Sequence, residues 1–375
     1  MTSSNSNHIT SKAISNISPE ATRLLKPEKP KGPDIKISKK YMVVGIGNAI
    51  VDILANVEDR FLDIHKMEKG MMQLIDEAGV ASLHKKIKAE KQASGGSAAN
   101  TIAGLASLGH DVAFIGKVKD DELGRTFEKG LNDIGVMYCT KRASEGSATA
   151  CCVILTTPDA QRTMNTCLGI SGTLGPEDID EKMISGAGIV YLEGYLWDSG
   201  PAKAAFKKAI RTAGKSGGEV ALSLSDSFCV ERHRAEFLEL IENHTDILFA
   251  NEDEIKTLFE AGSFEEAARS CARYSNIFAL TRGGLGSVII DGRNYHKISP
   301  EKDIKVLDTT GAGDMYAAGF LHGYINKRDL AICGRMGNIT AAAVIGHFGA
   351  RPEISLAEIL EEKLKINLTG KDKHV

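Results

Sequence analysis

The chain has 375 residues, 42% hydrophobic and 25% charged content and a formal net charge of -3, which is typical of a soluble globular protein with one large or two modest domains. The body of the chain has no basic stripe, which argues against a nucleic-acid-binding protein. Seven cysteines without a C-x-x-C pair predict neither a disulfide framework nor a zinc site, and they fit the reducing cytoplasm. No uninterrupted apolar run approaches the length of a membrane-spanning helix.

The first forty residues differ in composition from the rest. Residues 1–40 are rich in Ser, Asn, Lys and Pro, lack apolar periodicity, and carry eight Lys or Arg against three acids. We expect a solvated, disordered tail, with an organelle address or a weak contact with an anionic surface as alternatives. A second short tail is expected at residues 366–375.

From residue 41 onward, strand-like and helix-like segments alternate. The expected strands are 41–48, 111–118, 188–194, 219–225 and 246–251, and the expected helices are 98–109, 121–135, 200–217 and 230–243. This alternation predicts a mostly parallel sheet covered by helices on both faces. Ligands in such folds gather beyond the carboxyl ends of the strands.

Two segments interrupt the alternation. Residues 53–75 and 137–166 contain short strand-like runs with no helix evident between them. We expect a small antiparallel sheet that projects from the main domain as a lid. Edge strands of the main sheet are the alternative.

The sequence DTTGAGD, residues 308–314, precedes an apolar run whose spacing predicts a helix that begins near Ala312 or Gly313. The free N–H groups and the dipole at a helix start attract anions, and glycines allow close approach. Gly311, Ala312 and Gly313 are therefore a candidate anion cradle with Asp314 beside it. On spacing alone, Asp314 fits an ordinary first-turn acid equally well.

A second cluster follows the first strand and opens the first long helix. Asn48 and Asp52 offer an amide and a carboxylate that suit a vicinal diol, Gly95 and Gly96 allow a ligand to approach the main chain, and Asn100 can donate and accept. Each pattern also occurs in ordinary turns. The run GIGNAI lacks the third glycine of a dinucleotide fingerprint, which argues against a nicotinamide-dependent oxidoreductase.

Three further features lie in the second half of the chain. Asn251 and Glu254 share a helix face and offer oxygen ligands for Mg²⁺, although a helix cap with a first-turn acid explains them as well. The run TRGGLGS, residues 281–287, is either a hairpin turn or a loop beside a nucleotide. Tyr195 and Trp197 either stack on a purine or pack under the lid.

Together these motifs resemble the ribokinase-like (PfkB) family of sugar and nucleoside kinases over roughly residues 41–355. The resemblance rests on GGSAANTIAGLASLG and DTTGAGDMYAAGFL, which occur in the expected order. It implies a ribokinase-like three-layer α/β/α kinase domain over residues 41–365, with a central, mostly parallel sheet and a β-sheet lid. The segments GIGNAIVDI, QRTMNT and YLEGYLW are most similar to the branch that phosphorylates adenosine.

The resemblance also implies a reaction, ATP-dependent phosphorylation of a hydroxymethyl group with Mg²⁺, and a role for each matching residue. These roles are the general base (Asp314), the anion hole (Gly311, Ala312, Gly313), the sugar hydroxyls (Asn48, Asp52, Gly95, Gly96, Asn100), Mg²⁺ (Asn251, Glu254), the nucleotide loop (Thr281, Gly283, Gly286), the phosphates (Arg162) and a monovalent cation such as K⁺ (Asp308, Thr310).

The implied enzyme is a cytoplasmic monomer or homodimer with a nucleoside or sugar and ATP as partners, and with neither nucleic acid nor membrane. Alternative acceptors are those of ribokinases, fructokinases and inosine or guanosine kinases. A non-catalytic nucleoside sensor is a further alternative, which the combination of Asp314 with the glycine cradle disfavours.

Overall fold

The computed structural model describes residues 39–364 except residue 160. The two tails expected at residues 1–40 and 366–375 therefore lie outside the described residues, apart from Lys39 and Lys40. Within the described ranges, no helix combines the length and apolar character that crossing a bilayer requires.

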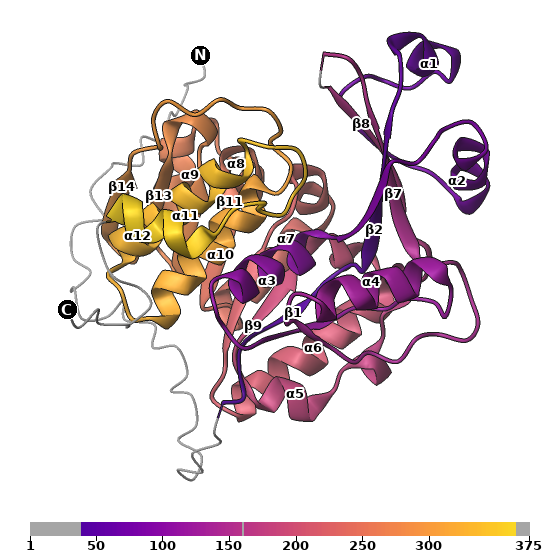
Figure 1. Ribbon diagram of the computed structural model, residues 1–375. Helices are drawn as coiled ribbons and strands as arrows, with labels where there is room; N and C mark the ends of the chain where they lie inside the picture. The colour runs from indigo at the N-terminus through magenta and orange to yellow at the C-terminus, as the bar shows by residue number, and fades with distance from the viewer. Residues whose placement is uncertain (1–38, 160, 365–375) are drawn as a thin grey trace, which may run out of the picture. The chain divides into compact units, whose positions relative to one another are not determined.

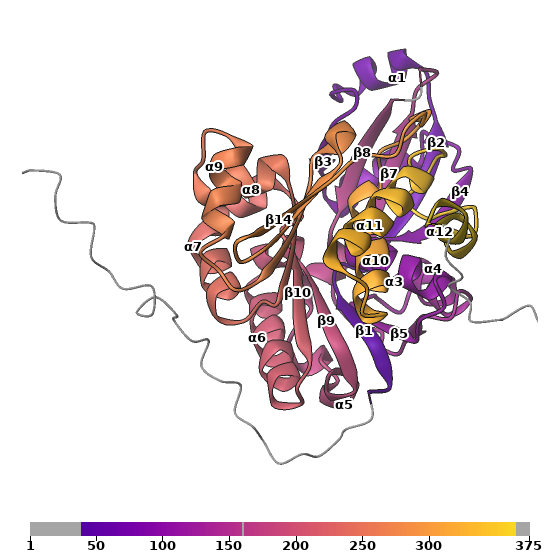
Figure 2. The same cartoon turned by 90° about the vertical axis from the view of Figure 1, so that its left-hand side faces the viewer.

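A large sheet forms the centre of the described chain (Figures 1 and 2). From one edge to the other its strands are β14 (Asn294–Ile298), β13 (Ser287–Asp291), β12 (Ile277–Thr281), β11 (Ile247–Asn251), β10 (Glu219–Ser223), β9 (Ala187–Glu193), β1 (Tyr41–Ile46), β5 (Val112–Ile115) and β6 (Met137–Tyr138). All neighbours from β6 to β12 pair in parallel, and β13 and β14 pair antiparallel. This arrangement confirms the mostly parallel sheet that the alternation predicts.

Helices cover both faces of the large sheet, as Figure 2 shows. One face packs against α5 (Glu181–Ser185), α6 (Gly200–Lys215), α7 (Ser227–Asn243), α8 (Glu252–Phe259) and α9 (Phe264–Cys271). The other packs against α3 (Ser97–Ser107), α4 (Glu122–Asn132), α10 (Ala312–Ile325) and α11 (Leu330–Val344), with α12 (Leu356–Leu364) against α11. Parallel strands buried on both faces are continuously apolar, and Val43, Val44 and Ile46 of β1 are fully buried. The three-layer α/β/α class is confirmed.

Helix α10 is buried because its small residues let neighbouring helices approach closely. A Cβ added at Gly319 would collide with α11 at Thr340 and at the backbone of Met336, and one at Gly104 of α3 would lie 2.8 Å from Cβ of Ala318. This packing holds the start of α10 firmly against α3.

A second, smaller sheet rises away from the large one in Figure 1. Its strands in order are β3 (Met72–Leu74), β8 (Arg162–Cys167), β7 (Ala150–Thr156), β2 (Ile50–Asn56) and β4 (Lys91–Gly95). The sheet is mixed, because β2 pairs parallel with β7 and β3 pairs parallel with β8. The expectation of a purely antiparallel sheet is therefore wrong.

Two short helices lie between the strands of the small sheet, and the first of them falls within residues 53–75, where no helix was expected. They are α1 (Asp59–Ile64) and α2 (Glu77–His84). Leu62 of α1 and Leu83 of α2 pack with Val153 and Leu155 of β7, so the helices cover one face of the sheet. Each helix is too short to show a clear period of 3.6 residues, which is why the sequence does not reveal it.

The strand at Met137–Tyr138 belongs to the large sheet rather than to the lid. It pairs with β5, and the Tyr138 ring packs against Phe114 and Phe127. The Tyr138 hydroxyl also donates to the carbonyl of Gly116 at 2.9 Å. The apolar side of this short strand thus lies in the main core, which corrects the expected lid boundary at residue 137.

Candidate active site

The start of α10 is shaped by Gly311, which has a φ of +77°. A Cβ on this residue would lie 2.6 Å from both Cα and O of Ala350, so the position accepts only glycine without rearrangement. Gly313, two residues later, is exposed, and a Cβ there would meet nothing within 4 Å. The predicted helix start is confirmed, and its first turn is open to an approaching anion.

Asp314 lies in the first turn of α10 and is held by the first turn of α3. Ser97 Oγ donates to its Oδ1 at 2.7 Å, and Asn100 Nδ2 donates to its Oδ2 at 3.1 Å. Burial raises the pKa of Asp314 to about 6, while these two hydrogen bonds and the charge of Arg351 act in the opposite direction. The carboxyl group is therefore oriented, and it titrates close to neutral pH.

Asp52 of β2 lies against the glycine pair that precedes α3. A Cβ on Gly95 would overlap the Asp52 carboxylate, and one on Gly96, which has a φ of +93°, would overlap the carbonyl oxygen of Asn48. Packing within the protein therefore requires glycine at both positions, whether or not a ligand binds there. The sequence does not reveal this requirement.

The Asp52 carboxylate belongs to the same electrostatic cluster as Asp314. Burial raises the pKa of Asp52 to about 6, the charges of Arg351 and then Arg162 lower it, and the charge of Asp314 raises it. The two carboxyl groups therefore influence each other's titration.

Asn48 is held from behind by a buried acid. Its Nδ2 donates to Glu193 Oε1 at 2.8 Å, and its Oδ1 accepts from Ser171 Oγ at 2.8 Å. Glu193, at the carboxyl end of β9, also accepts from the backbone N–H of Ala98 at 2.8 Å, and burial raises its pKa to about 7. Asn48 is only 3% exposed, and these contacts fix the orientation of its side chain.

Asn251 and Glu254 form a capping box at the start of α8. Asn251 Oδ1 accepts from the N–H of Glu254 at 2.9 Å, and the Glu254 carboxylate accepts from Asn251 N at 3.0 Å and from Nδ2 at 2.6 Å. The helix-cap interpretation is therefore correct. Both residues nevertheless line the same cavity as Asp314.

The chemistry around Glu254 fits a hard divalent cation. Burial, with a smaller contribution from the charges of Asp226 and Asp253, raises the pKa of Glu254 to about 7, although the hydrogen bonds from Asn251 act in the opposite direction. A nearby cation would favour the ionised form. The described residues contain no group of three or more His, Cys, Asp or Glu able to hold a metal ion. Mg²⁺ here would thus need further oxygen ligands from water or from phosphates.

Two adjoining cavities meet at the start of α10. The first, of about 340 Å³, is lined by Asp314, the glycine cradle, Glu254 and Tyr195. The second, of about 510 Å³, is lined by residues of the β12–β13 turn and of α11, namely Thr281, Gly283, Gly286, Asn338, Ala341 and Ala342. The cavities share Thr281, Thr309, Ala312, Gly313 and Tyr316. TRGGLGS therefore forms a hairpin turn that lines a cavity, and its position beside a nucleotide stays a prediction.

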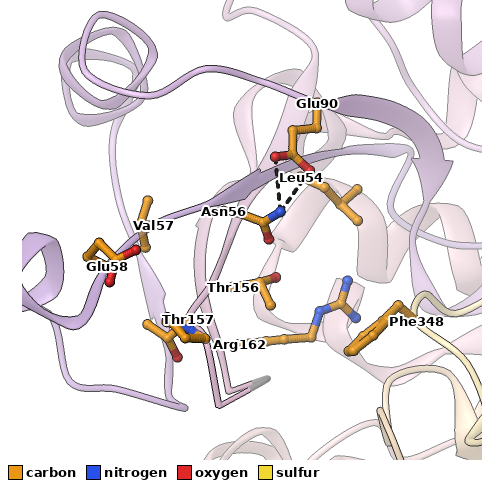
Figure 3. Close-up of a pocket in the computed structure, with 10 residues that line it drawn as sticks. Leu54, Asn56, Val57, Glu58, Glu90, Thr156, Thr157, Arg162 and Phe348 are labelled. Atoms are coloured by element: carbon orange, nitrogen blue, oxygen red, sulfur yellow. Dashed lines mark hydrogen bonds between the residues drawn. The ribbon is translucent and has the colours of Figure 1, made fainter.

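Arg162 joins the small sheet to the segment that leads into α10. It forms a buried ion pair with Asp308, and its Nη1 donates to Thr310 Oγ1 at 3.2 Å. Asp308 also accepts from the N–H of Gly349 at 2.8 Å. Figure 3 shows Arg162 extending toward Phe348 across a third cavity, of about 590 Å³. Arg162 therefore already supplies a positive charge to Asp308, and a monovalent cation such as K⁺ beside Asp308 and Thr310 stays a prediction.

Residues 65–356 match the model of the pfkB family of carbohydrate kinases. The chain belongs to this family. The resemblance seen in the sequence is thereby confirmed, and the protein is a phosphotransferase that acts on an alcohol group of a sugar or nucleoside. ATP is the co-substrate that the family implies.

Individual kinases of known sequence or structure are similar over most of the chain. An ATP-dependent ribose-1-phosphate kinase from Halopiger xanaduensis is 31% identical over 265 residues, which cover 71% of this chain and 84% of the relative. A crystal structure of an adenosine kinase from Sinorhizobium meliloti is 44% identical, with a TM-score of 0.81, over 86% of this chain and 99% of that one. That of a probable sugar kinase from Rhizobium etli is 41% identical, with a TM-score of 0.82, over 88% and 100%.

The kinase fold separates the two aromatic candidates. Trp197 is 1% exposed, packs against Phe206 and Phe237, and donates from Nε1 to Glu236 at 3.0 Å, so it belongs to the core and cannot stack on a ligand. Tyr195 lines the cavity that contains Asp314.

Three further residues of the kinase site were not predicted from the sequence. Glu193 and Ser97 lie within motifs already singled out, and an acid at a strand end or a hydroxyl in the first helix turn is the signal that could have found them. Arg351 follows α11 in a loop with no recognisable motif, and only the folded structure brings it to Asp52 and Asp314.

We expect Arg162→Met to lower the free energy of unfolding by about 3 kcal/mol or more, because it leaves Asp308 buried without its cation. The double variant Arg162→Met/Asp308→Asn should recover much of this loss. Denaturant unfolding of the two variants measures the difference. If the double variant is as unstable as the single one, the unpaired charge of Asp308 is not the cause of the loss.

Proposed function

We propose that this kinase transfers the γ-phosphoryl group of ATP to the 5′-hydroxyl of adenosine, giving AMP and ADP. The observation that carries the proposal is the position of Asp314, a carboxylate oriented by two hydrogen bonds beside a glycine cradle at a helix start. The 44% identity with an adenosine kinase over nearly its whole length supports the choice of acceptor.

In the proposed reaction Asp314 accepts the proton of the 5′-hydroxyl as that oxygen forms its bond to the γ-phosphorus. The bond between this phosphorus and the bridging oxygen of ADP breaks, and ADP leaves with that electron pair. The cradle at residues 311–313 presents N–H groups to the transferring phosphoryl group, and Arg162 approaches from the small sheet. With a pKa of about 6, Asp314 is largely ionised at neutral pH and can act as a base.

Asn251 and Glu254 would hold Mg²⁺ from one side of the cavity, together with water and phosphate oxygens. When bound, this ion neutralises charge on the phosphates. The nucleotide is proposed to lie along Thr281, Gly283 and Gly286, which line the adjoining cavity.

The small sheet is proposed to act as the lid of this site. Its contact with the main domain through Arg162 and Asp308 supports a closed arrangement that would keep water away from the γ-phosphate. We further propose that the enzyme is cytoplasmic, since all seven cysteines are free, as in a reducing compartment. We propose that it is a monomer or a homodimer.

The charges around the acceptor site favour a neutral acceptor. Arg351 acts on both Asp52 and Asp314, and Arg162 acts on Asp52 as well but is also paired with Asp308. An acceptor that already carries a phosphate would bring a further negative charge beside two carboxylates. The similarity to a ribose-1-phosphate kinase nevertheless makes that sugar phosphate the second candidate.

An acceptor panel with MgATP tests the proposal. We expect the highest kcat/KM with adenosine and lower values with inosine, guanosine, ribose, fructose and ribose 1-phosphate. ADP formation coupled to product identification measures each rate. Faster turnover of ribose, fructose or ribose 1-phosphate than of adenosine would contradict the nucleoside assignment.

A further inference from the structure

Arg351 reaches the acceptor side of the site on the loop between α11 and α12. This loop is held at two neighbouring points, since Ala350 packs against Gly311 and the N–H of Gly349 donates to Asp308. Arg351 is therefore positioned by the same contacts that shape the start of α10.

The guanidinium group of Arg351 uses only part of its hydrogen-bonding capacity. Its Nε donates to Asn100 Oδ1 at 3.2 Å, and its Nη1 donates to Ser94 Oγ at 2.7 Å. Its Nη2 is buried and has no hydrogen-bond partner within the described ranges. A buried N–H donor without an acceptor is costly, and a ligand that supplies an acceptor relieves that cost.

The contact with Asn100 gives Arg351 a positioning effect on the proposed base. Because Oδ1 of Asn100 accepts from Arg351, its Nδ2 is directed to Asp314. A reversed amide would place N–H groups opposite the guanidinium and lose both hydrogen bonds.

Asp52 and Arg351 lie on the same side of the site, since the Asp52 carboxylate lies against Gly95 and Arg351 donates to the preceding residue, Ser94. Their charges act on each other. A carboxylate accepts hydrogen bonds from hydroxyl groups, whereas a guanidinium donates to hydroxyl oxygens. Together the two groups complement both functions of a vicinal diol.

We propose that Arg351 is a specificity-determining residue whose free Nη2 donates to one oxygen of a vicinal diol on the acceptor, while Asp52 accepts from that diol. This inference rests on the proposed kinase function but not on adenosine being the acceptor. It assigns the diol a cationic donor in addition to the polar groups that the sequence motifs provide.

Selectivity for the diol in Arg351→Gln and Arg351→Lys tests the proposal. The probes are adenosine and its 2′-deoxy and 3′-deoxy analogues, or the best acceptor of the panel and analogues that lack one vicinal hydroxyl. We expect Arg351→Gln to weaken binding of the diol acceptor by about 10- to 100-fold and binding of one deoxy analogue much less. The preference for the diol is then largely lost. The lysine variant keeps the charge, loses the planar fork, and should show the same trend.

Binding of each acceptor by calorimetry without ATP gives a readout that does not need turnover. If the protein fails to transfer a phosphoryl group to any acceptor, the proposed function is wrong, but calorimetry still measures the contact with the diol. Arg335→Gln, an exposed arginine on α11, is the matched control and should leave the preference unchanged. If Arg351→Gln does not fold, Arg351→Lys decides. Equal weakening of diol and deoxy acceptors would overturn the proposal.

Discussion

Asp314→Asn should lower kcat by about 10²- to 10⁴-fold, because it removes the group proposed to accept the proton of the acceptor hydroxyl. The amide can keep both contacts, because its oxygen can accept from Asn100 Nδ2 while its NH2 group donates to Ser97 Oγ. The start of α10 and the affinities for ATP and acceptor should therefore change little. Single-turnover rates and equilibrium binding separate the two effects.

Asp329→Asn provides the matched control for this loss. Asp329 is an exposed acid that precedes α11, so the same chemical change there should leave kcat unaffected. A non-catalytic nucleoside sensor would give no turnover before or after the substitution. Normal turnover of Asp314→Asn would show that another group acts as the base.

Gly311→Ala should abolish most of the activity and lower the free energy of unfolding by about 1 to 3 kcal/mol. The added Cβ would lie 2.6 Å from atoms of Ala350. The alanine would also have to adopt the left-handed φ of +77° that the glycine has. The loop that carries Ala350 must then move away, and the cradle loses its shape. Thermal or denaturant unfolding and kcat/KM measure the two losses.

Gly313→Ala separates the two effects of Gly311→Ala. Its Cβ meets no protein atom within 4 Å, so the fold should remain as stable as the wild type, while a phosphoryl group approaching the exposed main chain would be hindered. Gly214→Ala in α6, where a Cβ is likewise unobstructed, is the control for the substitution itself. Full activity of Gly313→Ala would argue against phosphoryl binding at this helix start.

The sequence predicts the layers of the fold and the start of α10 because these features depend on local periodicity. The apolar run after Gly313 and the buried strand at 41–46 have signals within a few residues. The small sheet is predicted less well. The parallel pairing of β2 with β7 joins segments about a hundred residues apart, and no local pattern encodes it.

The candidate site shows the same division between local and distant contacts. The motifs around Asp314 and Asn100 indicate the cradle and its partners, and the structure joins them by a hydrogen bond. Arg351 and the pairing of Arg162 with Asp308 depend on where loops and the small sheet come to lie, which the sequence does not reveal. The raised pKa of Asp314, about 6, likewise follows from its burial in the folded chain and has no signal in the sequence.

The pH dependence of kcat/KM tests the role of Asp314 most directly. A base must be ionised to accept a proton, so the rate of the wild type should fall as the pH drops through about 6. Asp52 has a raised pKa as well, so Asp314→Asn is also made in an Asp52→Asn background. Asp52→Asn alone should keep an acidic limb, whereas the residual activity of the double variant should lose it. An acidic limb that survives unchanged in the double variant would contradict the account.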